Sequence, residues 1–255
     1  MDVTTTTAIA FEGVTKRYGD ATVVDAVTLD IAEGSFVALV GTSGSGKSTL
    51  LKMVNRLVEP DAGAVRVAGA AVAGGDAPAL RRSIGYVFQN VGLFPHLSVA
   101  DNIAIRARLG EGVPDVGALL TQVGLEPDVA GRSPRALSGG QQQRVGIARA
   151  LAGDAKILLM DEPFGALDPV TRERIGQTVR DLHVARGLTT IMVTHDMGEA
   201  LLLADRVLVM VAGRIVADAT PAEMLRAEDG PAAALVAVPR GQAARMQALA
   251  DGGAA

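Results

Sequence analysis

The sequence contains the segment Gly41-Thr42-Ser43-Gly44-Ser45-Gly46-Lys47-Ser48, which matches the phosphate-binding loop pattern G-x-x-x-x-G-K-[ST] at every fixed position. An apolar run at 35–40 predicts a strand before it, and a helical pattern at 49–57 follows it. In this setting the backbone N–H groups of the loop form an anion site at a helix N-terminus. Lys47 adds a positive charge for the β- and γ-phosphates, and Ser48 offers a hydroxyl to Mg²⁺. The alternative is an ordinary Gly/Ser turn before a helix, and the flanking strand and helix argue against it.

The composition sets broad limits on function. The 255 residues are enough for one large domain, and 24 basic against 28 acidic side chains leave a net charge of −4. This balance argues against a bulk nucleic-acid-binding protein, so no nucleic-acid partner is expected. The absence of cysteine excludes disulfides and cysteine-based metal sites. No apolar run reaches the ~18 residues of a membrane span, and the first residues lack the cationic and apolar regions of a secretory signal.

A second candidate anion site lies in the segment Leu137-Ser138-Gly139-Gly140-Gln141. Ser138 is a favourable N-cap, and the pattern at 141–152 is strongly helical. The segment therefore places free N–H groups and a hydroxyl at the start of a helix, where an anion is stabilised. A Gly-Gly turn that only begins a helix is the alternative interpretation.

Two carboxylates follow directly after an apolar strand. The run 157–160 has the continuous apolarity of a strand buried on both faces of a parallel sheet, and it leads into Asp161 and Glu162. Ligand sites of such sheets lie at the carboxyl ends of the strands. Asp161 is therefore a candidate for the Mg²⁺ shell of a phosphate-loop nucleotidase. Glu162 points the other way and can accept a proton from an attacking water.

Several isolated side chains allow two interpretations from their positions alone. Tyr18 can stack on a purine or cover the end of a strand. Gln89, after the strand 84–88, can reach a metal or be a loop residue, and His195, after the strand 189–194, can bond a γ-phosphate or belong to the rim. We expect His183 at the surface of the amphipathic helix 169–186 and His96 to be structural or exposed.

Two other segments have unusual composition. The loop 90–98 carries Val, Leu, Phe and Leu with few charges, which indicates burial against either a partner or its own domain. From about residue 230 the chain is rich in Ala, Gly and Pro, and we predict a loosely held tail with a weak helix at 241–249.

Taken together, the segments 41–48, 137–141 and 157–162 closely resemble the Walker A, signature and Walker B motifs of the nucleotide-binding subunits of ATP-binding cassette (ABC) transporters, in the same order and spacing. The resemblance covers about residues 8–228. It implies an α/β fold: a P-loop NTPase core with a mostly parallel sheet, an N-terminal antiparallel β subdomain and an inserted α-helical signature subdomain at about 90–150. Residues 229–255 are then a short Ala/Gly-rich tail without a regulatory repeat module.

The same resemblance implies an enzyme that couples hydrolysis of ATP, with Mg²⁺, to transmembrane transport. It assigns catalysis to Lys47, Glu162 and the switch residue His195, and the metal to Ser48, Gln89 and Asp161. The implied nucleotide contacts are Tyr18, Gly41, Thr42, Ser43, Gly44, Ser45, Gly46, Lys47, Ser48, Thr49, Gln89, Ser138, Gly139, Gly140, Gln141 and the D-loop Asp168. Gly165 stands where the D-loop of the family often begins with Ser, which removes a hydroxyl contact.

The family also implies particular partners. Two copies of the chain pack head to tail, so that each ATP lies between the loop 41–48 of one copy and the segment 138–140 of the other. The loop 90–98 lies where these subunits contact the coupling helix of the transmembrane permease, and a substrate-binding protein acts indirectly. Such subunits are peripheral, on the cytoplasmic face of the bacterial inner membrane.

Two segments, 51–60 and 89–96, resemble the ATPases of importers for quaternary amines such as glycine betaine, choline and carnitine, which act as osmoprotectants. The alternatives are an importer of amino acids or another small solute, an ABC exporter, and a non-transport ABC ATPase, although the chain lacks the tandem cassettes or coiled-coil insertions of the last class. A phosphoryl-transfer kinase shares the phosphate loop, but it explains neither the signature segment nor the glutamate directly after Asp161.

Overall fold

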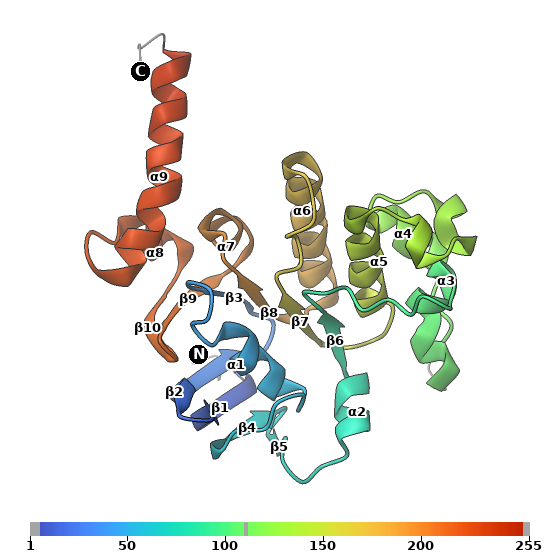
Figure 1. Ribbon diagram of the computed structural model, residues 1–255, viewed down its shortest axis with the longest axis horizontal. Coiled ribbons are helices and arrows are strands. Elements are labelled where there is room, and N and C mark those ends of the chain that lie inside the picture. Colours follow the sequence, from blue (N-terminus) through green and yellow to red (C-terminus); the bar gives the residue numbers. More distant parts are fainter. Residues whose placement is uncertain (1–5, 110–111, 252–255) are drawn as a thin grey trace, which may run out of the picture.

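The computed structural model describes residues 6–109 and 112–251, which form two β-sheets with helices packed around them (Figure 1). The smaller sheet has the strand order β2-β1-β4-β5, and the larger has the order β10-β9-β3-β8-β7-β6. This arrangement confirms the predicted α/β fold class with a P-loop NTPase core.

The smaller sheet is antiparallel and forms from the first segment of the chain. Strands β1 (Thr7–Tyr18) and β2 (Ala21–Ala32) join at a tight turn, and β4 (Ala62–Val67) and β5 (Ala70–Ala71) continue the sheet. The register pairs Phe11 with Leu29, and both side chains are buried on the same face. The sheet therefore matches the expected N-terminal antiparallel unit.

The larger sheet carries the phosphate loop. Strands β3 (Phe36–Val40), β6 (Ile84–Val87), β7 (Ile157–Asp161), β8 (Thr189–Thr194) and β9 (Arg206–Val211) are parallel, and β10 (Arg214–Ala219) is an antiparallel edge strand. Every residue of β3, β7 and β8 is buried, as the continuous apolar runs predict for strands covered on both faces.

Helices cover the two faces of the larger sheet and create two apolar clusters. On one face α1 (Lys47–Val54) packs with the smaller sheet. On the other face lie α5 (Gly139–Leu151), α6 (Pro169–Arg186) and α7 (Met197–Leu203). The shorter helices are α2 (Ala77–Arg82), α3 (Val99–Ile103), α4 (Val116–Gln122) and α8 (Pro221–Arg226), with 3₁₀ turns at Ala104–Leu109, Pro127–Gly131 and Pro134–Ala136. In Figure 1, α3, α4 and α5 gather at one end of the molecule.

The C-terminal segment is helical at 241–249, as predicted, but the helix also covers the preceding residues, where only a loose tail was expected. It forms one 21-residue helix, α9 (Gly230–Ala250), which projects from the body in Figure 1. Ala232 and Val236 are buried in its first half, whereas residues 242–250 are all exposed. Helix formation follows from the high intrinsic helix propensity of its alanines. The prediction of a loose tail gave too little weight to this propensity.

His183 is also a correction, because it is buried, not on the surface. It continues an inward stripe on α6 with Ile175 and Val179, at a spacing of four residues. Its ring lies 5.2 Å from that of Phe36, and Nδ1 is 2.9 Å from the Thr190 hydroxyl. Because the ring packs against Phe36 and its Nδ1 has a hydrogen-bond partner, His183 has a structural role in the core.

Candidate functional site

The phosphate loop follows β3 and packs closely against neighbouring backbone. Gly46 has φ +105°, and a Cβ atom there would lie 2.3 Å from the carbonyl oxygen of Val23. Gly41 is similarly confined, with its added Cβ 2.2 Å from the Met210 carbonyl oxygen. Both positions therefore require glycine. Residues 43–49 line a pocket of about 250 Å³ together with Val23, Gln89 and Glu162.

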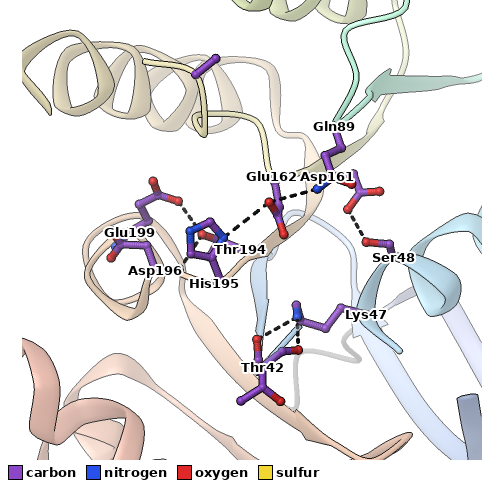
Figure 2. A network of polar contacts seen from close by, with 12 residues as sticks. Thr42, Lys47, Ser48, Gln89, Asp161, Glu162, Thr194, His195, Asp196 and Glu199 are labelled. Atoms are coloured by element: carbon purple, nitrogen blue, oxygen red, sulfur yellow. Dashed lines mark hydrogen bonds and ion pairs between the residues drawn. The ribbon is translucent and has the colours of Figure 1, made fainter. Parts of the chain in front are cut away.

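Lys47 is buried at the base of this pocket. Its Nζ donates to the carbonyl oxygens of Gly41 and Thr42, at 2.8 and 2.9 Å (Figure 2). Burial lowers the pKa of Lys47, and the nearby carboxylates of Glu162 and Asp161 oppose that shift. The ammonium group is thus held on loop carbonyls, at the place where a phosphate would be its stronger acceptor.

Asp161 is the last residue of β7, and its carboxylate contacts two side chains from one face of α1. Ser48 Oγ donates to Asp161 Oδ1 at 2.6 Å, and Lys52 Nζ lies 3.5 Å from Oδ2. Ser48 and Lys52 are four residues apart, so one helix face presents both. A hydroxyl beside a carboxylate is a hard-oxygen donor set that suits Mg²⁺. The described residues contain no cluster of three or more His, Cys, Asp or Glu, so such a metal needs phosphate and water ligands as well.

Glu162 follows Asp161 with φ +47°, and its carboxylate contacts other residues than the Asp161 carboxylate does. Its N–H donates to the Val193 carbonyl oxygen at 2.9 Å. Its carboxylate accepts from Gln89 Nε2 at 3.2 Å and lies 3.5 Å from His195 Nδ1 (Figure 2). Residues from the ends of β6, β7 and β8 therefore meet beside the pocket, as expected at the carboxyl edge of a parallel sheet.

Sequence reasoning missed Gln143, which fixes the segment after Glu162. This buried side chain donates from Nε2 to the Glu162 carbonyl oxygen at 3.1 Å and accepts from Ala166 N at 2.9 Å. Gln143 lies one helical turn before the buried Ile147 on α5, and that spacing was the only signal in the sequence.

The remaining predicted contacts lie outside the pocket of this chain. Tyr18 ends β1 with 52% of its surface exposed, and the Lys16 ammonium stands 5.5 Å from its ring centre. Ser138 and Gln141 form a reciprocal capping box at the start of α5, and Asp168 caps α6 by accepting from Thr171 N. Neither these residues nor Gly139 and Gly140 line the pocket over the phosphate loop. One chain thus brings together only part of the predicted site.

The loop 90–98 is fastened to its own domain by polar side chains. Arg149 donates to the carbonyl oxygens of Val91 and Gly92 at 2.7 and 2.8 Å. The buried Asn102 both donates to the Phe94 carbonyl oxygen and accepts from Phe94 N. The Phe94 side chain points outward and is 43% exposed. The backbone is therefore fixed, while an aromatic side chain stays accessible.

Comparison with known proteins identifies the class. Residues 24–165, more than half of the chain, match the family model described as ABC transporter. The chain therefore belongs to the ABC transporter family and is an ABC ATPase that binds ATP, as the three motifs indicate. Within the described residues, none of the helices combines the length and apolarity needed to cross a membrane.

Individual relatives narrow the comparison. The chain is 50% identical to the glycine betaine uptake system ATP-binding protein YehX of Escherichia coli K12, over 85% of this chain and 72% of that protein. It is 44% identical to the glycine betaine/carnitine/choline transport ATP-binding protein OpuCA of Bacillus subtilis, over 86% of this chain and 59% of that one. An Fe(3+) ions import ATP-binding protein of Rhodococcus jostii, FbpC 1, is 47% identical over 86% of this chain and 64% of its own length. The chain thus spans about three fifths to three quarters of these relatives.

Solved structures agree with the fold. The dimeric structure of MJ0796, a bacterial ABC transporter cassette, superposes with a TM-score of 0.78 at 36% identity and covers 84% of this chain and 98% of that one. A post-hydrolysis state of the same cassette, bound to ADP and Pi, gives a TM-score of 0.77 at 34% identity over the same shares.

Proposed function

We propose that this chain is the motor subunit of an ABC importer for quaternary amines such as glycine betaine or choline, working in pairs on the cytoplasmic face of the bacterial inner membrane. The names of YehX and OpuCA support the cargo, and the segments 51–60 and 89–96 resemble that class. FbpC 1, at comparable identity, supports Fe(III) as the alternative cargo.

One observation carries the proposal of a pair. The phosphate-loop pocket contains Lys47 and Glu162 but none of the residues 138–141. The start of α5 nevertheless offers a helix N-terminus, which favours an anion. Each site is therefore completed by Ser138, Gly139, Gly140 and Gln141 of a second copy, with Asp168 at the same interface and Tyr18 stacking on the adenine.

In the hydrolytic step the residues of this chain act from two sides. Lys47 leaves the loop carbonyls for the β- and γ-phosphates and stabilises their charge. Glu162 accepts a proton from the attacking water, while Gln89 and His195 hold its carboxylate and the water in place. Ser48, Gln89 and Asp161 would hold Mg²⁺, which neutralises phosphate charge when it is bound.

The loop 90–98 is proposed to dock the permease. Its backbone is fixed by Arg149 and Asn102, so the exposed Phe94 is presented on a rigid support. A preformed apolar anchor is what a coupling helix can bind with little ordering cost. The substrate-binding protein acts only through that permease.

Glu162→Gln tests the pair and the base together. The variant keeps the shape of the pocket but loses the proton acceptor, so it is expected to bind ATP, hydrolyse it at least ~100-fold more slowly and accumulate as a dimer with ATP and Mg²⁺. Size-exclusion chromatography with light scattering gives the mass, and the surface variant Glu59→Gln is the control. A monomer under these conditions, or wild-type turnover, would contradict the proposal.

The cargo requires a cellular test. In cells whose own copy carries Lys47→Ala, uptake of labelled glycine betaine or choline is expected to fall while Fe(III) uptake stays unchanged. The reverse pattern would assign the chain to an iron importer and leave the motor function intact.

A further inference from the structure

Arg172 lies between two segments of the site that are far apart in the sequence. It belongs to the first turn of α6, and its NH2 group donates to the Leu167 carbonyl oxygen at 3.2 Å. On the other side, NH1 lies 3.6 Å from Asp196 Oδ2 and Nε lies 3.6 Å from Glu199 Oε1. One guanidinium group therefore contacts both the segment that ends in Asp168 and the segment that carries His195.

The two acidic partners of Arg172 determine the backbone around His195. Glu199 accepts from the Thr194 hydroxyl at 2.6 Å, and the same hydroxyl accepts from Asp196 N at 3.0 Å. Asp196 Oδ1 accepts from the N–H groups of Gly198 and Glu199, which begins α7. In Figure 2 the side chains of Thr194, Asp196 and Glu199 gather beside His195. These contacts connect both carboxylates to the two residues that flank His195, Thr194 and Asp196.

The segment on the Leu167 side is the one that the proposed second copy touches. Asp168 is exposed there and caps α6, whereas Leu167 is buried beneath it. Gln143 holds Ala166, so the segment is tied to α5 at its start and to Arg172 at its end. Arg172 thus contacts this segment twice, through its side chain on the Leu167 carbonyl oxygen and through its backbone N–H on the Asp168 carbonyl oxygen at 2.8 Å.

The contacts of Arg172 are incomplete in this conformation. Its Nε is buried and makes no hydrogen bond to any described residue, because Glu199 lies beyond hydrogen-bond range. A buried donor without an acceptor is unfavourable, so a small approach of Glu199 stabilises the group. A cavity of about 340 Å³ between α6 and α7, lined by Arg172, Glu199 and Leu203 among others, leaves room for that movement.

We infer that Arg172 is a positioning residue that transmits partner contact at 165–168 to His195. When the dimer closes, the partner displaces the segment at Leu167, and the Arg172 guanidinium approaches Glu199. The hydrogen bond between Thr194 and Glu199 then orients the His195 imidazole toward Glu162. This inference rests on the proposed dimer, and it assigns Arg172 no contact with nucleotide.

Hydrogen exchange on the ATP-bound Glu162→Gln protein tests the transmission. In that parent, dimer formation is expected to protect the amides of both 165–168 and 194–199. Adding Arg172→Met should leave protection at 165–168 and abolish it at 194–199. Arg180→Met is the matched control, because Arg180 lies on the same helix and pairs with Asp205 at 2.6 Å, away from both segments.

Turnover gives a second readout in the otherwise wild-type chain. Arg172→Met is expected to lower kcat about tenfold to a hundredfold through misplacement of His195, with KM for ATP changed less than about threefold. Arg172→Lys, which keeps the charge but not the fork, should recover part of the loss. Glu199→Gln interrupts the same link from the other end and should uncouple the two segments in the same way.

The outcomes separate the two proposals. If the Glu162→Gln parent stays monomeric, the proposed function fails. If the parent dimerises but Arg172→Met keeps protection at 194–199, or loses the dimer itself, the inference on Arg172 is overturned. Melting temperatures of Arg172→Met and Arg180→Met, compared in the same buffer, show whether Arg172→Met destabilises the whole fold. If it does, hydrogen exchange of Glu199→Gln decides: loss of protection at 194–199 alone supports the inference, and retained protection there overturns it.

Discussion

Replacing Lys52 by methionine tests how the buried carboxylate of Asp161 is stabilised. Asp161 is only 1% exposed, and its hydroxyl and ammonium partners, Ser48 and Lys52, both come from α1. A methionine side chain would keep most of the volume of the lysine stem but would leave the buried carboxylate with the Ser48 hydroxyl and the charge of Lys47 nearby. Removing the ion-pair partner of a buried charge is unfavourable, so the folded state should lose stability.

The size of the loss follows from distance and exposure. At an effective dielectric constant of ~20, unit charges 3.5 Å apart attract by about 4–5 kcal/mol. The Lys52 side chain is 36% exposed, so solvent screens a good part of this attraction, and about 2 kcal/mol is expected. The pair of Lys16 and Asp61 is closer, at 2.8 Å, yet the Asp61 side chain is 46% exposed against 1% for Asp161, so Lys16→Met should cost much less.

Urea unfolding gives the free energy of unfolding of Lys52→Met and Lys16→Met, first with a chelator and then with Mg²⁺ and ADP. In the chelator, Lys52→Met should unfold at lower urea than wild type, and Lys52→Arg should not. With Mg²⁺ and ADP the difference should narrow, because a divalent cation at Asp161 replaces the lost charge and binding to the folded state adds stability. Equal unfolding free energies within roughly 0.5 kcal/mol in the chelator, or a difference that Mg²⁺ and ADP leave unchanged, would refute the reasoning.

Two further predictions concern the loop and the core. Gly46→Ala places a Cβ atom 2.3 Å from the Val23 carbonyl oxygen at φ +105°, so binding of a fluorescent ATP analogue should weaken at least ~10-fold; wild-type affinity would contradict the loop geometry. Burial, and to a smaller extent repulsion from Arg180, lowers the pKa of His183 below its ordinary value of 6.5. Below about pH 6.5 the unfolded chain therefore takes up a proton that the folded chain does not. Urea stability should therefore fall from about pH 7 to about pH 5, and His183→Gln should reduce that fall; an unchanged pH profile would show that His183 does not titrate on unfolding.

The fold and the first half of the site could be predicted because their signals are local. The phosphate loop at 41–48 specifies its own backbone, and continuous apolar runs specify strands covered on both faces. Once β6, β7 and β8 are parallel neighbours, the residues that follow them must meet at one edge. Gln89, Glu162 and His195 therefore lie together as expected.

The contacts that sequence reasoning missed depend on packing between distant elements. Lys52 faces Asp161 only because α1 lies against the end of β7, and Arg172 faces Glu199 only because α6 and α7 are neighbours. Neither residue carries a motif. His183 was misplaced because histidine is common on helix surfaces, although its spacing from Ile175 and Val179 indicated the inward face.

The left-handed backbone of Glu162 connects the two halves of the site within one chain. A non-glycine residue at φ +47° is held at a cost of about 1–2 kcal/mol, so the surroundings must fix it. Its N–H is bonded to Val193 in β8, and its carbonyl oxygen accepts from Gln143, one turn into α5. The same helix begins at Ser138, which in the proposed dimer contacts the nucleotide of the other copy. In the proposed dimer, a nucleotide that displaces the start of α5 would therefore change the backbone of Glu162, the proposed base for the other nucleotide, and this contact would couple the two sites.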